Sequence, residues 1–145
     1  MAIVAAIILV PTVFAAGQLT SPNYMLRADE FMKGIIDNDL YQISVSDMVN
    51  ATENETEMAS WVILDVRPEA IYASGHIPGS MNVPFTNIIS DMDAVPADKK
   101  IAVVCTYDTN SAFAVAMLRI FGDRDAWIVQ GGIPAWQEAG GELAV

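Results

Sequence analysis

Short apolar runs alternate with amphipathic segments along most of the chain, and each pattern predicts a different element. Apolar runs rich in β-branched residues and bounded by polar residues are typical of buried strands. The pattern predicts strands over residues 41–45, 61–66, 81–83, 101–104 and 127–129. Apolar residues spaced three and four apart, together with capping and breaking residues, predict helices. These helices cover residues 26–36, 46–50, 68–74, 86–92, 111–121 and 133–139.

This alternation predicts an α/β fold with a mainly parallel sheet and helices on both of its faces. Ser46 is expected to cap the helix that follows it, and Gly122 and Gly140 to end the last two helices. The acidic residues 53–57 are expected to form a loop, and residues 93–100 a turn region.

The first sixteen residues carry no charged side chain and are almost wholly apolar. Their length suits the core of a signal peptide and is short for a full membrane span, although a positively charged start is missing. We interpret residues 1–16 as an export signal or an uncleaved membrane anchor, which predicts an extracytoplasmic protein (periplasmic, secreted or membrane-anchored). The alternative is a buried N-terminal helix. Residues 17–40 are then a linker with an appended helix, and residues 41–145 form the domain.

The chain is acidic, with a formal net charge of −11 and only 7 Lys and Arg among 145 residues. A composition without basic clusters argues against nucleic acid and against anionic membrane surfaces as partners. One cysteine cannot form an internal disulfide, and no Cys/His group has metal-ligand spacing, so we expect no metal and no cofactor. Two sequons, at Asn50 and Asn54, are glycosylation acceptors only if the host glycosylates.

Cys105 stands where the apolar run 101–104 gives way to a polar loop and then a helix. Backbone N–H groups of such a loop and the positive end of the helix dipole favour a thiolate or the anion that it carries. That geometry makes a thiol a nucleophile. The alternative is a small buried side chain selected for packing.

Three motifs surround this cysteine in the chain. Asp65-Val66-Arg67 is followed by Gly75-His76-Ile77-Pro78-Gly79, and Gly131-Gly132-Ile133-Pro134-Ala135-Trp136 comes after the cysteine. In residue type and order they resemble the signature of the rhodanese family of sulfurtransferases. The resemblance covers roughly residues 42 to 145.

The resemblance implies a single rhodanese-like domain with a mainly parallel five-stranded sheet, and a catalytic Cys105 that needs no cofactor. It also implies that Asp65, Arg67, His76, Gly131 and Gly132 hold the fold together. The expected substrate-binding residues follow the cysteine directly: Thr106, Tyr107, Asp108, Thr109, Asn110 and Ser111. We further expect Ser111 to cap the helix and to aim its hydroxyl at the thiol.

The loop departs from the family pattern at two places. Asn110 stands where the family usually has arginine, and Asp108 where it often has glycine. Asn110 still donates hydrogen bonds but brings no charge. Asp108 adds a negative charge close to the thiol, which disfavours the thiolate and repels anionic substrates. Phosphatases on this scaffold use a loop one residue longer that ends in arginine, and the seventh residue here is Ser111.

Two hypotheses follow from different functional classes. The first is an exported sulfurtransferase that carries sulfane sulfur as a Cys105 persulfide between a small donor and a thiol acceptor. Without the arginine, such an enzyme would prefer neutral or less anionic donors over thiosulfate. The second is a rhodanese-like binding or regulatory module that has lost catalysis. The N-terminal segment would serve either one as a membrane tether if it is not cleaved.

Overall fold

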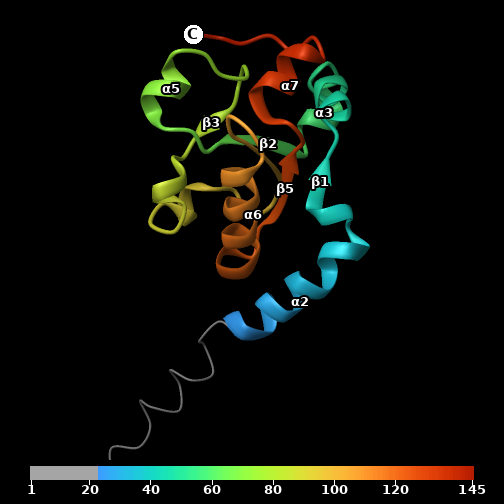
Figure 1. Ribbon diagram of the computed structural model, residues 1–145, viewed down its shortest axis with the longest axis vertical. Helices are drawn as coiled ribbons and strands as arrows, with labels where there is room; N and C mark the ends of the chain where they lie inside the picture. The colour runs from blue at the N-terminus through green and yellow to red at the C-terminus, as the bar shows by residue number, and fades with distance from the viewer. Residues whose placement is uncertain (1–22) are drawn as a thin grey trace, which may run out of the picture.

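The computed structural model describes residues 23–145, which fold around a five-stranded sheet (Figure 1). The strands are β1 (Gln42–Ile43), β2 (Trp61–Asp65), β3 (Met81–Asn82), β4 (Lys100–Val104) and β5 (Asp125–Val129). They are ordered β1-β5-β4-β2-β3, and all pairings are parallel. The predicted α/β fold with a parallel five-stranded sheet is confirmed.

Helices connect the strands and cover both faces of the sheet. The α-helices are α2 (Tyr24–Asp37), α3 (Val45–Thr52), α4 (Glu55–Met58), α5 (Glu69–Ala73), α6 (Thr109–Gly122) and α7 (Gly132–Glu138). Residues 23–145 also contain three short 3-10 turns: η1 (Asp39–Tyr41), η2 (Phe85–Asn87) and η3 (Met92–Ala94).

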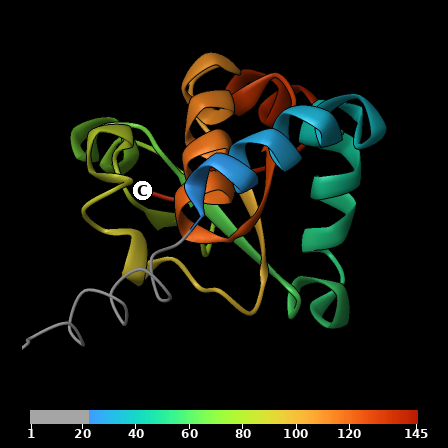
Figure 2. The same cartoon turned by 90° about the horizontal axis from the view of Figure 1, so that it is seen from below.

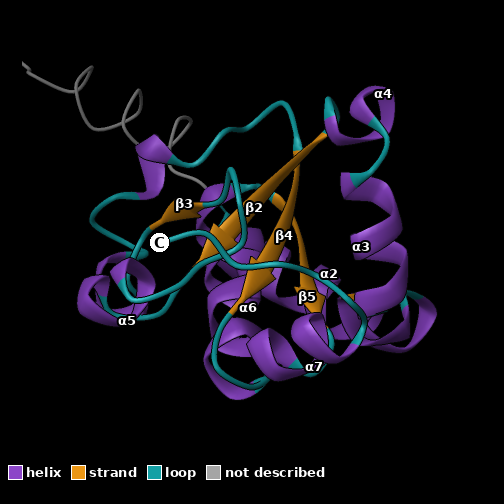
Figure 3. Cartoon of the chain, turned by 90° about the horizontal axis from the view of Figure 1, so that it is seen from above, coloured by secondary structure: helices purple, strands orange, loops and turns teal. Residues whose placement is uncertain are grey.

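Side chains of the central strands point alternately into two apolar layers, because successive residues of a strand face opposite sides of a sheet. Leu64 and Val103 pack in the layer that contains Leu118 of α6. Ile63 and Ala102 pack in the other layer, with α3 and α7. In Figure 1, α6 lies on one side of the strands, and α3 and α7 lie on the other. Figure 3 shows the same strands, in orange, from above. Burial on both faces explains why these strands read as continuous apolar runs.

The predicted amphipathic helix of residues 26–36 is present as the longer α2. The Asn23 side chain caps it by accepting a hydrogen bond from the Leu26 N–H at 3.0 Å. The Phe31 ring stacks on Tyr41 with a centroid distance of 5.2 Å. Figure 2 shows α2 crossing α6 on the outside of the domain, where Arg27 pairs with Asp123 at 3.0 Å.

The predicted signal or anchor of residues 1–16 lies outside the described residues, as does most of the predicted linker. Within residues 23–145, no helix combines the length and the apolar character needed to cross a membrane.

Two expectations between β1 and β2 were wrong. Ser44, not Ser46, caps α3, because its side chain accepts from the Asp47 N–H at 3.1 Å. The predicted strand 41–45 is correspondingly shortened to two residues. The predicted loop at residues 53–57 contains the short helix α4, since the Asn54 side chain accepts from two N–H groups at its start.

The expected α-helix at residues 86–92 is also wrong, because the segment forms the 3-10 turns η2 and η3 instead. Here the Ser90 hydroxyl donates to the Asn87 carbonyl at 3.0 Å, and short polar side chains of this kind compete with regular helical bonding. Helix α6 starts two residues earlier than expected, at Thr109. It includes Gly122, and Asp123 takes the left-handed conformation that ends it.

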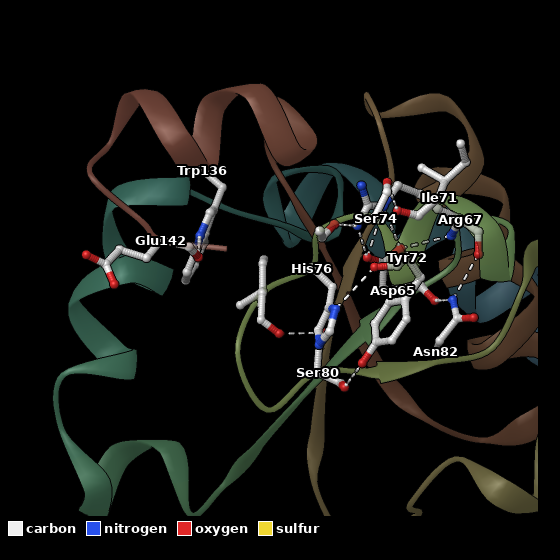
Figure 4. A network of polar contacts seen from close by, with 12 residues as sticks. Asp65, Arg67, Ile71, Tyr72, Ser74, His76, Ser80, Asn82, Trp136 and Glu142 are labelled. Carbon is white, nitrogen blue, oxygen red and sulfur yellow. Dashed lines mark hydrogen bonds and ion pairs between the residues drawn. The ribbon is translucent and has the colours of Figure 1, made fainter. Parts of the chain in front are cut away.

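A buried ion pair closes the carboxyl end of β2. Arg67 Nη2 lies 2.6 Å from Asp65 Oδ2, and the two side chains are 7% and 0% exposed. The same nitrogen donates to the Gly75 carbonyl at 2.8 Å. Asn82 of β3 donates to the carbonyl oxygens of both Asp65 and Arg67. The pair therefore joins β2, β3 and the turn after α5 in one polar network (Figure 4).

Removing one partner of this pair is expected to be strongly destabilising. Asp65→Asn leaves the Arg67 cation buried without its counter-charge, and such a change costs about 3–5 kcal/mol. We expect the free energy of unfolding to fall by that amount. Urea unfolding monitored by far-UV circular dichroism measures it.

The matched control is Lys33→Ala, which removes the exposed pair between Lys33 and Asp29. An exposed helical pair of this spacing contributes about 0.3–0.5 kcal/mol. Equal losses in the two variants would contradict the role given to the buried pair.

Candidate functional site

Cys105 lies directly after β4, at the carboxyl end of the central strands. It is 3% exposed and lies at a hollow of about 190 Å³. Ligands of parallel sheets bind at this edge, because loops from neighbouring strands meet there. The lining residues are Arg67, Pro68, Cys105, Thr106, Tyr107, Thr109 and Asn110.

The Cys105 sulfur has two hydrogen-bond partners, both on the segment that follows it. The thiol donates to the Tyr107 carbonyl oxygen, and Sγ lies 3.5 Å from Ser111 Oγ. No backbone N–H of residues 23–145 donates to Sγ.

Ser111 does not cap α6, contrary to expectation. It is fully buried, and its hydroxyl donates back to the Asp108 carbonyl at 2.9 Å. Asp108 occupies the N-cap position, but its side chain makes no capping bond. The first N–H groups of a helix have no intrahelical partners, so those of α6 stay available beside the hollow. As expected, the Ser111 hydroxyl lies near the thiol, with Oγ 3.5 Å from Cys105 Sγ.

The Asp108 carboxylate bonds to a neighbouring turn and does not line the hollow, although the sequence placed Asp108 among the substrate-binding residues. Asp108 Oδ1 accepts from the Gly131 N–H at 2.7 Å, and Asp108 is not a lining residue. The side chain thus joins the cysteine loop to the turn between β5 and α7.

The paired glycines allow that turn to approach the cysteine loop closely. Gly132 has a φ of 62°, and a Cβ there would lie 2.5 Å from the Cys105 carbonyl oxygen. The same carbonyl accepts from the Ile133 N–H at 3.1 Å. Only glycine fits so near a neighbouring backbone in this conformation. Gly131 and Gly132 therefore support the site without touching the hollow.

Arg67 and Pro68 were missed as lining residues by the sequence reasoning, which assigned Arg67 only to the scaffold. Their place in the chain could have indicated this role, because Arg67 and Pro68 directly follow β2, and β2 pairs with β4. Carboxyl ends of adjacent parallel strands meet at one edge of the sheet. Arg67 is also the single charged residue that lines the hollow within the described chain.

His76 lies in a separate polar arrangement. Its ring stacks on Tyr72 with a centroid distance of 4.0 Å, and Nδ1 is 3.1 Å from the Tyr72 carbonyl oxygen. It borders a different hollow, of about 590 Å³, and does not line the one at Cys105. A Cys-His pair is therefore not formed at Cys105. Across residues 23–145, no group of His, Cys, Asp and Glu side chains is placed to hold a metal ion.

Asp108→Ala and Asp108→Asn separate the bonding role of this side chain from its charge. Alanine removes the acceptor of the Gly131 N–H, whereas asparagine keeps an oxygen in its place. We expect the free energy of unfolding to fall by about 1 kcal/mol in Asp108→Ala and by less in Asp108→Asn. Iodoacetamide should also alkylate Cys105 faster in Asp108→Ala, because the loop is less restrained. Stability and alkylation equal to wild type in the alanine variant would contradict this assignment.

The chain is similar in sequence to the members of one protein family. The family model described as rhodanese-like domain matches residues 48–139. Thiosulfate sulfurtransferase GlpE of Shewanella oneidensis is 32% identical over 91 residues, which are 63% of this chain and 90% of that protein. GlpE of Pseudomonas fluorescens is 33% identical over 76 residues, or 52% of this chain and 70% of that protein.

Solved structures show the same fold. A rhodanese-related protein from Thermoplasma volcanium superposes with a TM-score of 0.63 at 29% identity, over 71% of this chain and 96% of that one. A rhodanese-like domain from Anabaena sp. gives a TM-score of 0.65 at 27% identity, over 72% and 78% of the two chains. With the matched motifs and the cysteine after β4, these likenesses show that the chain belongs to the rhodanese-like domain family.

Proposed function

We propose that the chain is a sulfurtransferase that carries sulfane sulfur as a persulfide on Cys105. The observation that carries the proposal is a single thiol at a hollow of about 190 Å³, beside the uncapped start of a fourteen-residue helix. The relatives named thiosulfate sulfurtransferase support the reaction class. The uncharged residues 1–16 support an extracytoplasmic location, as a secreted, periplasmic or membrane-anchored protein.

Loading of the site is a displacement at sulfur. The Cys105 thiolate attacks the outer sulfur of the donor, a new S–S bond forms, and the donor's own bond to that sulfur breaks. With thiosulfate the leaving group is sulfite, and the sulfur remains as Cys105–S–S⁻. The thiol must first lose its proton and leave the Tyr107 carbonyl, which repels a negative sulfur. A turn of the side chain toward the open N–H groups of α6 supplies donors for the persulfide anion.

Electrostatics at the hollow favours donors with little negative charge. Arg67 is the single charged lining residue of the described chain, and its Nε and Nη2 already bond to the Asp65 carboxylate. Asn110, at the rim, supplies hydrogen bonds but no charge. A dianion such as thiosulfate therefore lacks a free cationic partner. A neutral or monoanionic persulfide fits this site better.

A second candidate, a binding module without catalysis, is favoured by Asn110 in the place of the family's arginine. Such a module would use the same hollow to hold a partner or a small ligand. The position of Cys105 favours the sulfurtransferase, because this residue lines the hollow as well as belonging to the apolar core.

Mass spectrometry of the intact protein tests the sulfur carrier directly. After incubation with a low-molecular-weight persulfide, the protein should gain one sulfur atom, which a thiol reductant removes. The gain should vanish in Cys105→Ser. If a folded protein with a free thiol gains no sulfur from either the persulfide or thiosulfate, the sulfurtransferase proposal is wrong. The binding module is then the remaining candidate function.

Asn110→Arg tests the cause of donor preference. The new guanidinium supplies charge-assisted hydrogen bonds, each of which contributes about 1.5–3 kcal/mol. We therefore expect kcat/KM for thiosulfate to rise by about tenfold or more, and that for a neutral persulfide to change much less. Asn110→Gln is the matched control, since it lengthens the side chain without adding charge. An equal response in both variants would show that charge at this position does not set the preference.

A further inference from the structure

An apolar surface borders the Cys105 hollow. It consists of Tyr107, Phe113 and Phe85, and is called here the apolar rim. Tyr107 is 67% exposed and Phe113 58%. Phe85 is half-buried, and its ring centroid lies 6.5 Å from that of Phe113. Exposed aromatic side chains beside a hollow are typical of a binding surface.

The apolar rim is continuous with the hollow. Tyr107 itself lines the hollow, as do Thr109 and Asn110 in the first turn of α6. Phe113 follows these two residues by four and three positions, so it lies on the same side of the helix, one turn further on. The Phe113 ring therefore lies next to residues that line the hollow.

Helix α6 has an unusual composition for a helix at the surface. Its one charged residue, Arg119, bonds to the Asp125 carboxylate and the Ala126 carbonyl. Helices that are apolar on all sides are normally covered. Helix α2 covers the far end of α6, where Tyr24 packs on Phe121 at 5.1 Å. Among the aromatic rings of residues 23–145, only that of Phe85 pairs with Phe113.

The surface of the chain is acidic, since the net charge is −11. Asp91 and Asp93 follow Phe85 by six and eight positions, and both are exposed. The cation beside this segment, Arg124, already donates hydrogen bonds to the carbonyl oxygens of Met92 and Val95. An acidic surface of this kind attracts a partner with basic side chains.

We propose that the apolar rim docks a sulfur-accepting protein whose cysteine lies among apolar residues flanked by Lys or Arg. The inference rests on the proposed function and names its acceptor. The acceptor thiolate attacks the outer sulfur of the Cys105 persulfide, the S–S bond of that persulfide breaks, and Cys105 leaves as a thiolate. The acceptor becomes the new persulfide, and no oxidant or reductant is consumed.

Synthetic peptides test the acceptor class on the full chain loaded with one sulfur atom. One peptide has the sequence Lys-Leu-Cys-Phe-Lys, and its partner of equal charge is Lys-Ser-Cys-Ser-Lys. We expect the apolar peptide to take sulfur about tenfold faster, because aromatic anchors dominate such contacts. Phe113→Gln should abolish this preference, measured as the ratio of the two rates.

Phe121→Gln is the matched control. It changes the same residue type on the same helix, at a side chain that is 42% exposed and packs on α2 rather than beside the hollow. The preference for the apolar peptide should persist in this variant. Circular dichroism and thermal unfolding of both variants show whether the fold is retained.

Loading is measured first, by intact mass, so that the two proposals fail separately. Wild-type protein that gains no sulfur would overturn the proposed function and this inference together. Loaded protein that transfers equally fast to both peptides would overturn the docking role alone. A wild-type dimer that Phe113→Gln dissociates would also overturn it, because a second copy would then cover the apolar rim.

Discussion

The ion pair between Asp65 and Arg67 is the interaction on which the rest of the site depends. Two opposite charges are removed from water at the end of β2, and each is tolerated because the other is in contact with it. Their hydrogen bonds reach the turn before His76 and the neighbouring strand β3. The wall of the Cys105 hollow is part of this network, since Arg67 belongs to both. The scaffold thereby determines how much positive charge remains for a substrate.

The cysteine loop is restrained from the opposite side by Asp108 and by the turn at Gly131 and Gly132. The carboxylate bonds to a backbone N–H of that turn, and the absent Cβ of Gly132 lets two backbones meet. A residue whose charge is unfavourable for anion binding is thus used for position. The proposed preference for weakly charged sulfur donors is consistent with this role, because such donors need no cation in the loop.

Helix α6 connects the site to the outer surface. Its first turn supplies open N–H groups and two lining side chains, and its next turn presents Phe113 to solvent. The hollow has a volume of about 190 Å³, and the apolar rim lies beside it. A sulfur donor that fits the first and a protein acceptor that covers the second would use different parts of one helix.

The sequence by itself determined the sheet, the helix after Cys105 and the family, because these depend on local periodicity and on residues close together in the chain. Apolar runs rich in β-branched residues, such as 61–66 and 101–104, predict buried strands. Boundaries set by single side chains were less predictable: Ser44 took the capping role expected of Ser46, and Ser90 helped to replace a helix by 3-10 turns. Only the tertiary structure decided the roles of Asp108 and Arg67. The Asp108 bond joins residues 23 positions apart, and Arg67 meets the cysteine loop through strand pairing. Whether a charge faces a substrate or a backbone depends on such distant contacts, which local patterns do not record.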